Sequence, residues 1–96
     1  MKRDEALVFL SHFKAMNREK YQIRKIGFFG SVARDGAGEN SDVDVVVELD
    51  EPDLFHLIGI KQDIEAHFRR PVDIVRYRDT MNEFLKKRID QEAVYV

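Results

Sequence analysis

Apolar residues recur every three or four positions in three segments of the chain, which is the spacing of a helix with one buried face. The first segment covers residues 4–17, where the apolar positions are Ala6, Leu7, Phe9, Leu10, Phe13 and Met16. The second runs from Pro52 to about Phe68, and the third covers residues 81–90. Proline suits the first turn of a helix, because its missing N–H would have no partner there. These segments are predicted to be helices.

Three further segments have the composition of β-strands. Residues 23–29 form a largely apolar run, residues 42–49 alternate acidic side chains with valine and leucine, and residues 72–76 are again mostly apolar. Alternation at every second position is typical of a strand with one buried face. Between the first two strands, residues 31–34 are predicted to form a short helix, which a flexible turn at residues 35–38 ends. The predicted order is αβαβαβα.

This order predicts a single α/β (α+β) domain, residues 1–96, in which helices flank a small mixed β-sheet. A chain of 96 residues with 44% hydrophobic side chains holds one domain with a small core. The sequence has no cysteine, which excludes a disulfide framework and a thiolate zinc site. The N-terminal apolar run is too short for a signal peptide or a membrane span, so we expect a cytoplasmic protein that does not bind membranes.

The formal charge of −2 argues against a dedicated nucleic-acid binder, which is expected to be basic. Basic residues nevertheless cluster at positions 69–70 and 86–88. Such runs are most often solvated faces of a domain. The alternative for residues 86–88 is contact with an acidic partner or a nucleotide.

Two aspartates at alternate positions of a predicted strand, Asp42 and Asp44, point to the same face and could together hold a metal ion. The simpler alternative is the polar outer face of an amphipathic strand. A third carboxylate, Asp73, lies in an otherwise apolar strand, where a charge needs a cleft, a metal or a partner such as Arg76 or Arg78. Hard oxygen ligands of this kind favour Mg²⁺ or Mn²⁺ over zinc.

Gly30 and Ser31 follow the first predicted strand and open the short predicted helix. Backbone N–H groups at such a junction can bind a phosphate. The dipeptide alone is a common turn, so only its position gives it weight. Arg34, one turn further on, could reach the same phosphate, or it could pair with Asp35 or Glu39 at the surface.

The residues Gly30-Ser31, ten intervening positions and Asp42-Val43-Asp44, followed by Asp73 within residues 72–75, resemble the nucleotidyltransferase superfamily that includes DNA polymerase β. Within that superfamily the chain is most similar to the minimal nucleotidyltransferases, the MntA-type antitoxins that pair with HEPN-domain toxins. The resemblance covers nearly the whole chain and implies the nucleotidyltransferase fold.

The resemblance also implies a role for each motif residue. Gly30 and Ser31 would bind the phosphates of a nucleoside triphosphate substrate, expected to be ATP. Asp42 and Asp44 would hold two Mg²⁺ ions, with Mn²⁺ as a possible substitute, and Asp73 would help to hold the catalytic metal and favour deprotonation of an acceptor hydroxyl. Two such ions stabilise the attacking and leaving oxygens of an in-line displacement, here with pyrophosphate as the leaving group.

The short chain leaves no room for modules that bind a template, so no nucleic-acid template is expected. The resemblance implies instead that AMP is transferred to a hydroxyl, expected to be a tyrosine, of a HEPN ribonuclease toxin that forms a hetero-oligomer with this chain. Two alternatives stay open: an antitoxin that acts by binding and occlusion alone, and a nucleotidyltransferase of the aminoglycoside-modifying type.

Overall fold

The computed structural model describes residues 2–36, 38 and 41–96 of the chain. Within these residues the helices and strands follow one another as α1 (Arg3–Tyr21), β1 (Ile23–Phe29), β2 (Val43–Leu49), α2 (Leu54–Phe68), β3 (Val72–Arg76), α3 (Glu83–Glu92) and β4 (Val94–Tyr95). The strands form a sheet in the order β3-β2-β1-β4. Since β2 is parallel to β3 and antiparallel to β1, the sheet is mixed, and the predicted α+β class is confirmed.

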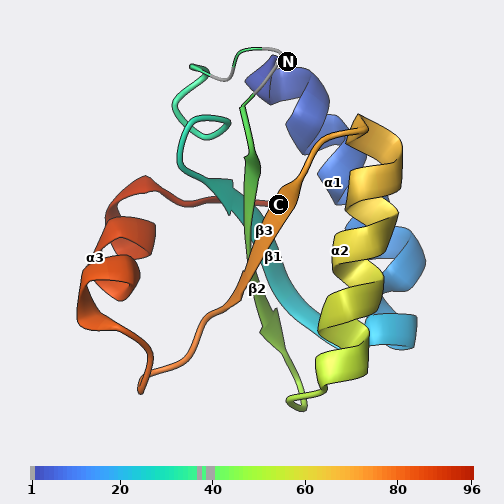
Figure 1. Ribbon diagram of the computed structural model, residues 1–96. Helices are drawn as coiled ribbons and strands as arrows, with labels where there is room; N and C mark the ends of the chain where they lie inside the picture. Colours follow the sequence, from blue (N-terminus) through green and yellow to red (C-terminus); the bar gives the residue numbers. More distant parts are fainter. Residues whose placement is uncertain (1, 37, 39–40) are drawn as a thin grey trace.

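Helices cover both faces of the sheet, with α1 and α2 on one face and α3 on the other (Figure 1). The middle strand β2 sends its side chains alternately to the two faces. Val45 and Val47 belong to the core under α1 and α2, whereas Val46 packs in a second core with Ile89 of α3. The simpler interpretation of the sequence made one face of β2 its polar outer face. On that face Val46 is buried under α3, whereas Asp44 is half-buried.

The start of α2 is set by a side-chain cap. The Asp53 carboxylate accepts hydrogen bonds from the Phe55 N–H at 2.8 Å and the His56 N–H at 3.2 Å. An aspartate at this position satisfies amide groups that have no partner within the helix. As a result α2 begins at Leu54 instead of at the predicted Pro52.

The short helix predicted at residues 31–34 is wrong. Residues 30–36, called here the β1–β2 turn, form successive turns, closed by the Arg34 N–H on the Gly30 carbonyl at 3.2 Å and by the Gly36 N–H on the Ser31 carbonyl at 2.8 Å. Three or four residues are too few to sustain a helix when a residue in the left-handed region begins the segment. Residue 37 of the predicted turn at 35–38 lies outside the described residues.

A second correction concerns the end of the chain. The last helix is followed by β4, which pairs with β1 through Gly27 and Tyr95 and through Phe28 and Val94. The described elements therefore run αββαβαβ and not αβαβαβα. No helix in the described part of the chain is long and apolar enough to cross a membrane.

Replacing Gly27 with alanine should destabilise the fold, because the new Cβ would meet the backbone of β4. It would overlap the Val94 carbonyl oxygen and lie 2.9 Å from the Tyr95 Cα, and neither atom can move without separating the strands. Forced overpacking of this kind costs about 1–3 kcal/mol of the free energy of unfolding.

Chemical denaturation of Gly27→Ala beside Gly36→Ala measures this effect. A Cβ at Gly36 would have its nearest neighbour at 3.9 Å, so this control should retain the stability of the unchanged chain. Equal stability of the two variants would contradict the close approach of β4 to β1.

Candidate active site

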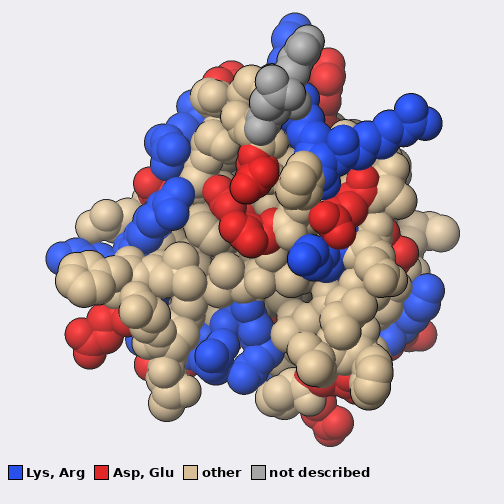
Figure 2. Space-filling view, in the orientation of Figure 1, with Lys and Arg blue, Asp and Glu red and all other residues tan. Residues whose placement is uncertain are grey.

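The sheet brings two of the three predicted aspartates together. Asp44 of β2 and Asp73 of β3 are partners in the register of these parallel strands, so they lie on the same face, the one that α3 covers further along. Asp42 lies just before β2 and is exposed, as is Asp73, whereas Asp44 is half-buried. Figure 2 shows acidic side chains gathered in the upper part of the face that it displays, above a group of basic side chains.

The surroundings of Asp44 act against ionisation of its carboxyl group. Burial and the neighbouring Asp73 carboxylate raise the pKa of Asp44 above its usual range, and Asp42 adds to this effect. Arg88 and Arg34 act in the opposite direction but do not outweigh it. Carboxylates held together in this way repel one another, and a bound cation would relieve the repulsion.

The donor chemistry of these residues fits a hard divalent cation. Carboxylate oxygens on neighbouring strands are the ligands that Mg²⁺ takes in proteins. Among the described residues, however, no three His, Cys, Asp or Glu side chains already stand in the arrangement of a metal site. What the structure shows is the Asp44–Asp73 pair with Asp42 beside it.

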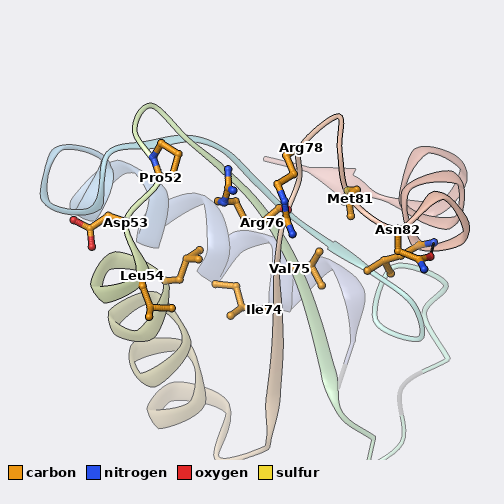
Figure 3. A pocket seen from close by; sticks show the side chains of 11 residues that line it. Pro52, Asp53, Leu54, Ile74, Val75, Arg76, Arg78, Met81 and Asn82 are labelled. Carbon is orange, nitrogen blue, oxygen red and sulfur yellow. Dashed lines mark hydrogen bonds between the residues drawn. The ribbon is translucent and has the colours of Figure 1, made fainter.

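The alternative predicted for Asp73, an ion pair with Arg76 or Arg78, is not observed among the described residues. The ion pairs among the described residues do not include Asp73. Arg78 instead donates a hydrogen bond to the carbonyl oxygen of Arg76 at 3.1 Å. Both arginines line a groove at the other end of β3 (Figure 3).

This groove has a volume of about 590 Å³ and lies between the start of α2, the end of β3 and the start of α3. Its lining is Pro52, Asp53, Leu54, Leu57, Ile74, Val75, Arg76, Arg78, Met81, Asn82 and Leu85. It contains neither the three predicted aspartates nor Gly30 or Ser31. The groove is therefore a separate feature that begins one residue beyond Asp73 on β3.

Gly30 fits its position because it has no side chain. Its φ of 70° lies in the left-handed region, which disfavours residues with a Cβ. A Cβ at this position would overlap the Asp44 Oδ2 and lie 3.1 Å from the Asp44 Cγ and 3.2 Å from the Arg88 Nη2. The absence of a side chain thus allows the Asp44 carboxylate to lie against the backbone of the β1–β2 turn, and Ser31 follows directly at a half-buried position.

The Arg34 side chain forms an ion pair with a residue that the sequence did not suggest. Its Nη1 is 2.9 Å from the Glu92 Oε1 at the end of α3. Asp35, one of the two predicted partners, accepts a hydrogen bond from the Arg3 N–H at 2.9 Å, and the other, Glu39, lies outside the described residues. The Arg34 side chain therefore connects the β1–β2 turn to α3.

Two residues of α3, Arg88 and Glu92, complete this part of the site. The Arg88 Nε lies 3.2 Å from the Glu92 Oε2, and its guanidinium carbon lies 5.5 Å from the centre of the Phe29 ring. The sequence placed Arg88 in a basic run that was most simply a solvated face, and Glu92 lay beyond the predicted end of the helix. Their spacing of four residues on one helix face was the available signal, but it did not indicate the turn that they contact.

Comparison with known proteins agrees with this arrangement. The sequence matches the family described as the nucleotidyltransferase domain over residues 10–96. It is 36% identical over 90 residues to the protein adenylyltransferase MntA of Thermococcus cleftensis, and the alignment covers 93% of this chain and 89% of that protein.

Solved structures share the fold. One that carries the provisional description of a minimal nucleotidyltransferase superposes with a TM-score of 0.78 at 28% identity, over 98% of this chain and 95% of that chain. A chain from the complex of tri-AMPylated Shewanella oneidensis HEPN toxin with MNT antitoxin gives a TM-score of 0.60 at 18% identity, over 90% of this chain and 68% of that chain.

The family match includes the Gly30-Ser31 turn and all three aspartates, and it extends over all the described strands. The resemblance that this motif suggested is therefore confirmed, as is the prediction of an enzyme that transfers nucleotidyl groups. This chain belongs to the nucleotidyltransferase domain family.

Proposed function

We propose that this chain is a Mg²⁺-dependent protein adenylyltransferase, the antitoxin that transfers AMP from ATP to a hydroxyl group of a HEPN ribonuclease toxin. The observation that carries the proposal is the Asp44–Asp73 pair, held in register on β2 and β3 with the Asp44 carboxylate against Gly30. This arrangement puts two carboxylates beside a turn that offers a backbone N–H, which supports a site for transfer of a nucleotidyl group.

The proposed roles of the residues are those that the family motif implies. The Gly30 N–H and the Ser31 hydroxyl bind the β- and γ-phosphates of ATP, with Arg34 beside them. Asp42 and Asp44 would hold two Mg²⁺ ions, which Mn²⁺ could replace, and Asp73 would help to hold one of them. When bound, these ions supply charge stabilisation for the attacking and leaving oxygens of an in-line displacement.

The reaction exchanges a phosphoanhydride bond of ATP for a phosphate ester bond to the acceptor. The acceptor oxygen forms a bond to the α-phosphorus, the bond from that phosphorus to the bridging oxygen of the β-phosphate breaks, and pyrophosphate leaves. Asp73 is exposed at the start of β3, where an acceptor from another chain can approach it, and its carboxylate favours removal of the hydroxyl proton.

The partner and the acceptor are inferred from the relatives. The support comes from the relatives, one named protein adenylyltransferase MntA and one solved as an MNT antitoxin with a tri-AMPylated HEPN toxin. We infer a tyrosine acceptor, a hetero-oligomer with the toxin in the cytoplasm, and no nucleic-acid template. Residues 1–96 act in this proposal as one nucleotidyltransferase domain.

Intact-mass spectrometry of a co-expressed HEPN partner tests the proposal. The partner is incubated with this chain, Mg²⁺ and each of the four nucleoside triphosphates in turn. We expect the mass to increase by one or more AMP groups with ATP alone, and peptide mapping to place the modification on tyrosine. An unchanged mass together with tight binding and inhibition of the toxin would replace the proposal with an antitoxin that acts by occlusion.

A further inference from the structure

The carboxylate of Glu92 occupies the β1–β2 turn in the manner of a bound anion. Its Oε2 accepts a hydrogen bond from the Gly30 N–H at 3.3 Å and lies 3.2 Å from the Arg88 Nε. Its Oε1 lies 2.9 Å from the Arg34 Nη1. Donors from the turn and from α3 thus converge on one carboxylate, as they would on the oxygens of a phosphate group.

We propose that Glu92 is an internal anion that the triphosphate of the substrate displaces, and that Arg88 and Arg34 then bind the phosphate groups. The inference rests on the proposed function, since it concerns the substrate of the same site. It adds Arg88 as a phosphate-binding residue and Glu92 as a competitor for the turn.

Arg88 is well placed for this exchange. Its Nη2 lies 3.2 Å from the position that a Cβ of Gly30 would take, and its guanidinium lies over the Phe29 ring. Phe29 is the last residue of β1, so the ring keeps the arginine beside the turn after Glu92 has left. About half of the Arg88 side chain is exposed, which leaves donors free to reach a ligand.

The charges favour a ligand more negative than one carboxylate. Two guanidinium groups face the single charge of Glu92. The other carboxylate beside them, that of Asp44 against Gly30, would be neutralised by the cation that accompanies the substrate. A triphosphate carries several negative charges and offers two oxygens to each guanidinium fork. It can therefore satisfy both arginines more fully than Glu92 does.

Glu92 must leave because it uses the same donors. Burial disfavours its ionised form, but the Gly30 N–H and the Arg34 and Arg88 side chains outweigh this effect and lower the pKa of Glu92 below its usual range. At neutral pH the side chain is thus an anion. About a quarter of the Glu92 side chain is exposed, and in this inference it rotates towards solvent when the substrate binds.

A purely structural role for Glu92 predicts the opposite effect of removing its charge. If the carboxylate served only to tie α3 to the β1–β2 turn, Glu92→Gln would loosen the turn and weaken binding of the substrate. If it is a competitor, the neutral amide should make the arginines more available, and binding should become tighter.

Titration calorimetry of the full chain with ATP, and with inorganic triphosphate as a probe that lacks the nucleoside, separates these cases in the presence of Mg²⁺. We expect Glu92→Gln to bind both ligands about tenfold more tightly and Arg88→Gln to bind both about tenfold more weakly, as loss of one charged contact implies. In the double variant the gain from Glu92→Gln should shrink, because the arginine that it releases is absent.

Matched controls lie on the same helix. Glu83→Gln and Lys87→Gln make the same changes of charge at exposed positions of α3, and both should bind ATP as the unchanged chain does. Circular dichroism confirms that each variant is folded. If Glu92→Gln proves unstable, Arg88→Gln still tests the inference. Unchanged affinity of that variant for ATP and inorganic triphosphate overturns the inference.

The outcomes also separate this inference from the proposed function. Glu92→Gln that binds ATP no more tightly than the unchanged chain overturns the inference, whatever the mass of the toxin shows. The expected order of affinities with an unmodified toxin supports the inference and overturns the transfer to that partner. A chain and variants that bind neither ligand overturn both.

Discussion

Replacing Asp42 and Asp44 together with asparagine should abolish nucleotidyl transfer and leave the protein folded. Loss of one preorganised electrostatic contact already lowers turnover by about 10²–10³, so the double variant should lose more than about 10³-fold. Asparagine keeps the size and shape of the side chain but removes the charge that would hold a cation. The measurement is the rate at which the mass of the HEPN partner increases.

Stability should respond differently from activity. Burial and Asp73 raise the pKa of Asp44, so the ionised carboxylate is less favourable in the folded protein than in the unfolded chain. An acid with a raised pKa destabilises the fold as the pH rises through that pKa, and this cost is present at neutral pH. The metal-free double variant should therefore melt at the same temperature as the unchanged chain or higher.

A control with the same change of charge is available on the same strand. Glu48→Gln with Asp50→Asn neutralises two acids at the far end of β2, where they face Lys25 and Arg24. This control should transfer AMP at the normal rate. Normal transfer by the Asp42 and Asp44 double variant would contradict the assignment of these aspartates.

Gly30→Ala is expected to have the second large effect, because it disturbs the backbone and the acidic pair at once. The alanine would have to hold a φ of 70° and to displace the Asp44 carboxylate that now lies against the turn. Left-handed backbone at a residue with a Cβ costs about 1–3 kcal/mol of the free energy of unfolding. Movement of Asp44 should lower transfer by more than about 100-fold, since small displacements of catalytic groups have effects of that size.

The control for this variant is Gly36→Ala in the same turn, where a Cβ would make only an ordinary van der Waals contact, 3.9 Å from the Ser31 carbonyl oxygen. Melting temperature, ATP affinity and AMP transfer are measured for both proteins. Gly36→Ala should match the unchanged chain in all three. If Gly30→Ala does so as well, the close approach of the turn to Asp44 is not required for function.

Much of the fold could be predicted because buried apolar residues recur at regular spacings along the sequence. The predicted strands at 23–29 and 72–76 match β1 and β3 residue for residue, since each is a mostly apolar segment bounded by turn residues. The strand with alternating acids was also found, although Asp42 lies just before β2. Local patterns therefore sufficed for the elements whose side chains pack in the core.

The failures come from contacts between distant residues. β4 has two residues, and it is a strand only because Gly27 leaves room for its backbone beside β1. Glu92 reaches Gly30 across 62 positions of the sequence, and no local pattern indicates such a contact. The motif identified the aspartates and the turn, but the α3 side chains that meet the turn were visible only in the folded protein.

The pairing of β4 with β1 has a consequence for the newly made chain. β1 lies between β2 and β4. Among the described residues, its second edge is closed by Val94 and Tyr95 and by the Val96 N–H, which donates to the Ile26 carbonyl at 3.1 Å, and these residues leave the ribosome after all the motif residues. Until then, β1 presents unpaired N–H and C=O groups along a strand of mostly apolar residues. Open edges of this kind pair readily with other chains and lead to aggregation. A protein trimmed before residue 94 would therefore become a target for chaperones and proteases while still carrying every residue of its motif.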